Sequence, residues 1–198
     1  MKTTLPLLLL FVLPFCLPAQ TLTSCKDGNA FLIVEDGDFY CYTAFDDAVK
    51  STPHEKIFFF HDHPIQTLIV PTETYKSNGA EDIPILSSYV VSETEYFSGM
   101  FKQELQLGIV PVKLPGEKTA VIWYYPLPKH EDPETPLEKV AVKQYAISLV
   151  LGNYVYTIAS SLFADDDEEA LRAMLSELAR NTGFGNGKPN AKKLCKKH

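Results

Sequence analysis

The stretch FFFHDHP, residues 58–64, places two histidines one residue apart at the end of an aromatic run. Side chains alternate between the two faces of a strand, so His61 and His63 point the same way in an extended chain. Both imidazoles can then reach one zinc or copper ion. Alternatively, they mark the point where a strand emerges into solvent. A catalytic zinc ion normally needs three protein ligands, and no other cofactor is predicted. The remaining histidines are His54, His130 and His198.

Other catalytic patterns are absent from the sequence. It contains no GxSxG elbow, no HExxH, no phosphate-binding loop and no GxGxxG. Ser160 and Ser161 lie at the end of a predicted strand, and either could act as a nucleophile only if a histidine and an aspartate converge on it. The sequence therefore assigns no catalytic residue and favours a non-enzymatic protein.

An aromatic triplet, Trp123-Tyr124-Tyr125, lies in another predicted strand. Trp123 and Tyr125 share a face, and an exposed aromatic face can stack on sugars or on a peptide. Burial of the same face in the core is the commoner arrangement. Trp123 and Tyr125 are thus candidate exposed aromatics.

Three cysteines follow the N-terminal segment, and an odd number in an oxidising compartment leaves at least one without an internal partner. The disulfide candidates are Cys25, Cys41 and Cys195. One interpretation pairs Cys25 with Cys41 and leaves Cys195 exposed. A second makes Cys25 a lipidation site and pairs Cys41 with Cys195. Neighbouring lysines favour the thiolate, so an unpaired Cys195 would be reactive and would indicate a thiol-linked role.

The first nineteen residues are typical of a secretory signal peptide, because one lysine precedes an apolar run that ends in a small residue. The alternative boundary removes residues 1–24 and leaves Cys25 as a lipidated first residue, as in an outer-membrane lipoprotein. Both interpretations predict a secreted or periplasmic protein. The sequence has no Asn-x-Ser/Thr sequon, which favours a bacterial envelope.

Residues 20–182 are expected to form one domain, and their charge is strongly acidic. They hold 12 basic and 25 acidic residues, a net charge of −13, so nucleic-acid binding is not expected. Residues 183–198 hold five lysines and no acid, and their Gly, Pro and Asn content predicts a flexible basic tail. Membrane contact is expected only through a lipid on Cys25 or through this tail.

The periodicity of the first 136 residues predicts mainly strands. Asp36-Gly37 is expected to turn a hairpin, Pro64 to separate two strands, and Ser92 with Glu95 to begin a helix as a capping box. The expected elements are a hairpin over 30–42, helical turns over 45–53, strands over 56–63 and 66–71, a loop over 72–84, a helix over 92–108, a strand over 117–128 and an acidic loop over 129–136.

The C-terminal part has the clearest pattern. Strands over 139–151 and 153–163 meet at Gly152-Asn153, a pair suited to a tight hairpin turn. A helix is predicted over 165–183, capped by Asp165 or Asp166. Its apolar stripe consists of Leu171, Met174, Leu175 and Leu178. Together these elements predict a single α+β domain, mainly an antiparallel sheet packed by a C-terminal amphipathic helix and one or two further helices.

A long hairpin followed by an amphipathic helix, over residues 139–182, resembles the end of PsbP-like α/β/α sandwich domains. That resemblance implies a secreted or lumenal accessory role, and it transfers no functional residue. We therefore expect a secreted or envelope-associated, non-catalytic accessory or binding protein, whose partner is a protein or a cell-envelope component. The alternative is a metal-binding protein or metal-dependent enzyme that uses His61 and His63.

Overall fold

The structure is a computed structural model, and it describes residues 19–52, 56–75, 81–116, 118–128 and 140–197. Residues 1–18 of the predicted signal peptide, the predicted acidic loop and the histidines at positions 54, 130 and 198 lie outside the described residues. Among the described residues, no helix combines the length and apolarity needed to cross a membrane.

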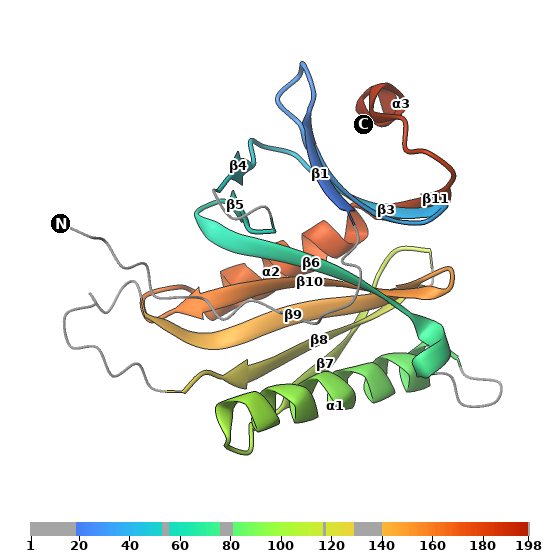
Figure 1. The fold of residues 1–198 in the computed structure, drawn as a ribbon. Helices are drawn as coiled ribbons and strands as arrows, with labels where there is room; N and C mark the ends of the chain where they lie inside the picture. Colours follow the sequence, from blue (N-terminus) through green and yellow to red (C-terminus); the bar gives the residue numbers. More distant parts are fainter. Residues whose placement is uncertain (1–18, 53–55, 76–80, 117, 129–139, 198) are drawn as a thin grey trace.

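Two antiparallel sheets form the body of the protein (Figure 1). The four-stranded sheet has the order β1 (Ala19–Ser24), β2 (Ala30–Asp36), β3 (Phe39–Phe45), β11 (Thr182–Asn186). The seven-stranded sheet has the order β4 (Lys50–Ser51), β5 (Phe58–Phe60), β6 (His63–Pro71), β10 (Tyr154–Phe163), β9 (Ala141–Leu151), β8 (Thr119–Pro126), β7 (Gly108–Lys113). The helical segments are η1 (Thr72–Thr74), α1 (Asp82–Phe101), α2 (Glu168–Arg180) and α3 (Ala191–Lys197).

The helices cover different faces of these sheets. Helix α1 packs on one face of the seven-stranded sheet, against β8 and β9. Helix α2 packs on the other face, against β9 and β10, and also contacts β3 of the four-stranded sheet. Helix α3 lies on the outer face of the four-stranded sheet (Figure 1). The predicted α+β class with a packed C-terminal amphipathic helix is confirmed.

The β9–β10 hairpin forms as predicted. Tyr154 pairs with Leu151, so Gly152 and Asn153 make the two-residue turn. The φ angle of Gly152 is 59°, a left-handed conformation that residues with a side chain adopt at a cost. The first hairpin differs by one residue, since Asp36 pairs with Phe39 and the turn residues are Gly37 and Asp38 rather than Asp36 and Gly37.

Helix α1 is longer than the sequence predicts and begins ten residues earlier. Ile85, Leu86, Tyr89 and Val90 continue the helical spacing toward the N-terminus, and all four are buried. Pro84 is accommodated because the first turn of a helix needs no backbone N–H donor. Ser92 and Glu95 therefore lie in the middle of the helix and form no capping box.

Two further predictions about local structure are wrong. Of the helical turns expected over 45–53, none forms in the described residues 45–52, because Lys50 and Ser51 pair with β5 as the short strand β4. Pro64 does not separate two strands, because it lies inside β6 opposite Phe59. The pairing of β6 with β10 begins only at Gln66. The missing N–H group of Pro64 therefore costs no hydrogen bond to β10.

The segment expected to be a flexible basic tail is instead structured. Thr182–Asn186 pair with β3 as strand β11, and Ala191–Lys197 form α3. The glycines of β11 explain this pairing: a Cβ atom at Gly183 would lie 2.4 Å from the Tyr42 hydroxyl, and one at Gly185 would lie 2.5 Å from the Tyr40 hydroxyl. The two tyrosine rings therefore lie across the glycines, which supplies the packing that glycine lacks in a strand.

Candidate functional site

The two histidines of HDH do not share a strand face, because residues 61 and 62 form the turn between β5 and β6. Phe60 pairs with His63 across this turn. His61 and Asp62 have φ angles of 49° and 62°, as a two-residue hairpin turn with a right-handed strand twist requires. His61 is exposed, and Asp62 forms an ion pair with Lys50 at 3.1 Å. The alternation argument for a shared metal site therefore does not apply.

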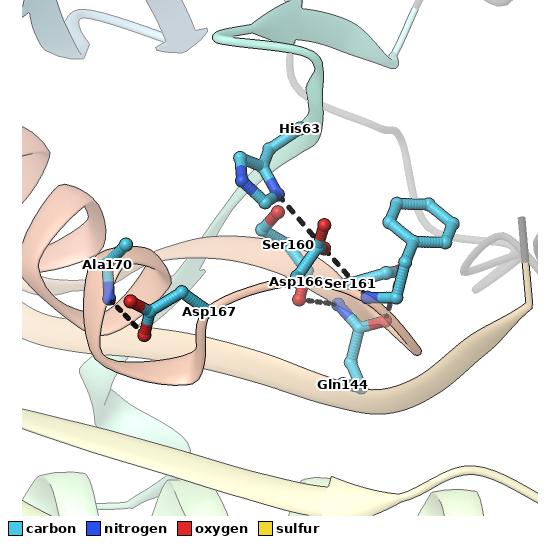
Figure 2. Close-up of polar contacts among 8 residues, drawn as sticks. His63, Gln144, Ser160, Ser161, Asp166, Asp167 and Ala170 are labelled. Atoms are coloured by element: carbon cyan, nitrogen blue, oxygen red, sulfur yellow. Dashed lines mark hydrogen bonds and ion pairs between the residues drawn. The ribbon is translucent and has the colours of Figure 1, made fainter. Parts of the chain in front are cut away.

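His63 instead faces the start of α2 (Figure 2). Its Nδ1 atom lies 3.6 Å from Oδ2 of Asp166, and both side chains are mostly buried. The same carboxylate oxygen accepts a hydrogen bond from the Phe163 backbone N–H at 2.8 Å. Asp166 thus closes the bend between β10 and α2, while Asp167 caps the helix by accepting from the N–H groups of residues 169 and 170.

Two serines next to this pair have different surroundings. Ser161 donates to Oε1 of Gln144 at 3.1 Å, and the Gln144 amide donates to the Ser160 carbonyl at 3.0 Å (Figure 2). Oγ of Ser160 is buried and has no hydrogen-bond partner among the described residues. A serine nucleophile must be reachable and hydrogen-bonded to its base, and Ser160, only 1% exposed, meets neither requirement.

No group of three His, Cys, Asp or Glu side chains within the part of the chain that the structure describes is arranged to hold a metal ion. The structure places His61 in a turn and His63 beside Asp166. A metal role for His61 and His63 stays a prediction.

Trp123 and Tyr125, the candidate exposed aromatics, are both buried at 2% exposure. Their shared face of β8 is covered by α1, and the Trp123 indole N–H donates to Ser148 Oγ at 2.9 Å. Tyr125 packs against Phe97 of α1 with ring centroids 5.3 Å apart. The prediction of an exposed aromatic face at this position is wrong, because helix α1 is longer than predicted and covers this face of β8.

The interface between α1 and the sheet contains a buried acid, Glu93, which is 7% exposed. Burial raises the pKa of its carboxyl from 4.5 to about 7, and Oε2 has no hydrogen-bond partner in the described chain. Its negative charge raises the pKa of nearby Tyr89, although burial is the larger cause there. Glu95, two residues on, is exposed, so the two glutamates do not form a carboxylate pair for catalysis.

A groove lies between the last turns of α1 and the loop that follows. The helix ends at Lys102, whose φ of 54° reverses the chain. The loop then folds back onto Ser98, whose carbonyl accepts from the Gln103 N–H at 3.1 Å and whose Oγ accepts from the Leu105 N–H at 3.2 Å. The groove encloses about 570 Å³. Its lining residues are Val91, Thr94, Glu95, Ser98, Lys102, Gln103, Glu104, Leu105 and Leu107.

The disulfide joins Cys25 to Cys195, a pairing that differs from both arrangements considered for the sequence. Among the described residues, Cys41 is the free cysteine, and it is buried in the inner face of β3. Cys25 lies just after β1, and β11 with α3 brings Cys195 back to the same end of the four-stranded sheet. The sulfur of Cys25 is therefore not available for a thioether-linked lipid, which conflicts with the lipidation interpretation.

Comparison with known proteins gives a likeness to a solved structure. No family model and no curated protein matches the sequence. The solution structure of cyanobacterial PsbP (CyanoP) from Synechocystis sp. PCC 6803 is similar with a TM-score of 0.43 and 11% sequence identity. The match covers 90% of this chain and 98% of that chain. This is a weak PsbP-like resemblance, and it transfers no function and no functional residue to this chain.

Proposed function

We propose that this protein is a secreted or envelope-associated, non-catalytic accessory protein that binds another protein through the outer face of α1. The observation that carries the proposal is the composition of that face and of the groove at its end. The polar cluster around His63 and Asp166 supports the non-catalytic part of the proposal, because Ser160 Oγ is buried and has no hydrogen-bond partner among the described residues.

The outer face of α1 is unusually poor in charge for an exposed helix. The twenty residues of α1 include no lysine and no arginine. Ile83, Val91 and Tyr96 are exposed by 42%, 47% and 41%. The other exposed residues of this face include serines and two acids, Asp82 and Glu95. Exposed helix faces of soluble proteins normally carry more charge opposite the buried stripe, so three exposed large apolar side chains favour contact with another protein.

The groove beside this face favours an apolar segment of the partner. Val91 and Leu107 contribute apolar walls, and Leu105 is held in the core beneath them. Glu95, Glu104 and Lys102 also line it, so the polar lining carries charges of both signs. We infer that the occupant is a short apolar peptide segment with polar flanks, since a strongly charged ligand would meet like charge from one of these residues.

The disulfide bears on the compartment in which this binding takes place. A disulfide persists in oxidising compartments and is uncommon in the cytosol, so Cys25–Cys195 is compatible with the predicted signal peptide. We propose that residues 1–19 are removed, because the alternative cleavage before Cys25 would also remove β1, which pairs with β2 along its whole length.

Site-specific photo-cross-linking tests the proposal. A photoreactive phenylalanine analogue would replace Val91 on α1 in one variant and the exposed Ala173 on α2 in a matched control. Irradiation in the native host should give a discrete adduct from position 91 and none from position 173. The cross-linked protein is then identified by mass spectrometry.

A substitution that adds charge completes the test. The Val91→Arg variant should retain its circular dichroism spectrum and melting temperature, since Val91 is largely exposed, but should no longer co-purify with the identified protein. Equal cross-linking from both positions, or unchanged co-purification of Val91→Arg, would contradict the docking role of α1.

A further inference from the structure

The disulfide lies at an accessible position on the outer face of the four-stranded sheet. It joins Cys25, in the bend after β1, to Cys195 of α3, with a Cα–Cα distance of 5.6 Å. Both cysteines are partly exposed at the edge of a small apolar cluster. A thiol from solvent can therefore approach the sulfur–sulfur bond, which is a first requirement for exchange.

The charges around the two sulfur atoms differ. Lys192, Lys193 and Lys196 surround Cys195 along α3 and are exposed, and none of them belongs to an ion pair in the described part of the chain. Cys25 is followed by one lysine and one aspartate. Positive charge stabilises a thiolate, so Cys195 is the better leaving group of the two.

Helix α3 is held on the sheet by few contacts besides the disulfide. It has seven residues, a length at which an isolated helix is not stable in water. Leu194 is its buried side chain, at 7% exposure, and it packs against Phe31, Ile33 and Ala44. Asn190 accepts from the Lys193 N–H at 3.0 Å and caps the helix start. Docking of α3 thus depends on one leucine and one covalent bond.

An aromatic surface lies under and beside α3. Phe31 is buried and contacts Tyr42 with ring centroids 6.1 Å apart, and Tyr40 lies 6.4 Å from Tyr42. These rings belong to the outer face of β2 and β3, whereas the inner face contributes to the main core with α2. Loss of α3 would therefore expose an aromatic sheet face and leave the main core intact.

We propose that Cys25–Cys195 is a thiol-exchange site for a dithiol reductant, and that opening it releases α3 and uncovers the aromatic outer face of the four-stranded sheet. The partner is defined by its chemistry as a small dithiol or a protein carrying two reactive cysteines. This site is independent of the α1 surface described above.

The exchange takes place in two steps. One thiolate of the reductant attacks Sγ of Cys25, the Cys25–Cys195 bond breaks, and Cys195 leaves as a thiolate that takes up a proton. The second thiol of the reductant then attacks the reductant sulfur of the mixed disulfide and releases Cys25 as a thiol. Two electrons pass to the protein, and the reductant ends as its own disulfide.

The remaining cysteine does not interfere with this reaction. Cys41 is fully buried, and burial raises the pKa of its thiol to about 12. It therefore has almost no thiolate at neutral pH. Brief alkylation of the native protein with iodoacetamide after dithiothreitol treatment should add two groups, on Cys25 and Cys195. Addition of none would mean that the native disulfide is inaccessible and would overturn the proposal.

Hydrogen–deuterium exchange with and without dithiothreitol then tests the release of α3. Amides of residues 191–197 should exchange at least tenfold faster in the reduced protein, while those of β9 and β10 stay protected at exchange times at which α3 is fully exchanged. Unchanged exchange in α3 would overturn the proposal. So would loss of protection in β9 and β10 at the same exchange times, because reduction would then unfold the whole protein rather than release one helix.

A double variant provides the matched control. In Cys25→Ser with Cys195→Ser, α3 should exchange at the reduced rate without any reductant, and dithiothreitol should change nothing. Oxidised-like protection of α3 in this variant would show that the helix docks without the covalent bond, contrary to the proposed mechanism.

Discussion

Glu93 is a carboxylic acid enclosed between α1 and the sheet, and its protonation affects stability. Its folded-state pKa of about 7 lies above the ordinary value of 4.5, so the folded protein binds the proton more tightly than the unfolded chain. Stability therefore falls as pH rises from about 4.5 through 7, and above 7 the full penalty of a buried charge remains. Oε2 has no hydrogen-bond partner in the described chain that would offset this penalty.

Replacing Glu93 with glutamine should remove the pH-dependent penalty. We expect Glu93→Gln to raise the free energy of unfolding by up to about 3.5 kcal/mol at pH 8, given about 1.4 kcal/mol for each pKa unit, and to change it little at pH 4.5. Chemical denaturation at the two pH values measures this. The exposed Glu95→Gln variant is the control and should change little at either pH. An equal effect of Glu93→Gln at both pH values would contradict the assignment.

The residue types in the sequence indicate candidates, but the sequence does not show what covers them. His61 and His63 are correctly noticed as neighbours, yet the alternation argument fails because residues 61 and 62 both adopt positive φ angles. Burial of Trp123 and Tyr125 depends on α1, which is remote in the sequence. Glu93 resembles any surface glutamate until the helix is placed on the sheet.

Among the helices and strands, those whose turn, cap and core-facing residues all lie within one short segment are predicted well. The β9–β10 hairpin contains its own turn residues, and α2 contains its own cap and apolar stripe, so both are found at nearly the correct positions. Elements whose partners are distant are missed. Strand β4 has only two residues, and the sequence of β11 is that of a glycine-rich tail, because the covering rings of Tyr40 and Tyr42 come from another part of the chain.

Replacing two glycines of these elements by alanine should change the free energy of unfolding in opposite directions. Gly152 has a φ of 59°, and a Cβ atom there would lie 3.3 Å from Phe39, so Gly152→Ala should lower the free energy of unfolding by about 1–2 kcal/mol. Gly99 lies in the last turn of α1, and a Cβ atom added there would meet no neighbouring heavy atom within 4 Å, so Gly99→Ala should raise it by up to about 1 kcal/mol. Thermal unfolding of both variants compares them directly, and a shift of the same sign in both would refute the argument.

For the whole molecule, the sequence predicts one α+β domain but not the division into two sheets. The predicted domain ends at residue 182, whereas Thr182 begins β11 and α3 closes the four-stranded sheet by a disulfide. Cysteine spacing cannot distinguish the three possible pairings, because the pairing depends on the position of β11 beside β3. The basic composition of the last residues also favours a flexible tail, although Leu194 and the disulfide hold α3 in place.

The disulfide should stabilise the whole fold as well as hold α3. The two cysteines are 170 residues apart, and the chain-entropy model gives about 5 kcal/mol for a closed loop of this length. Because release of α3 also returns freedom to the native protein, we expect the Cys25→Ser, Cys195→Ser variant to lose less than about 5 kcal/mol in guanidinium denaturation. A loss at or above that value would mean that α3 stays docked without the bond.

The pairing of β11 with β3 also determines the order in which the protein can be completed during synthesis. β7, β8, β9 and β10 pair with strands nearby in the sequence and can associate soon after they emerge from the ribosome. The edge of β3, by contrast, stays open until Thr182–Asn186 have been made. A nascent chain therefore carries an unpaired, aromatic-rich strand edge for most of its synthesis, and such an edge can pair with a strand of another chain.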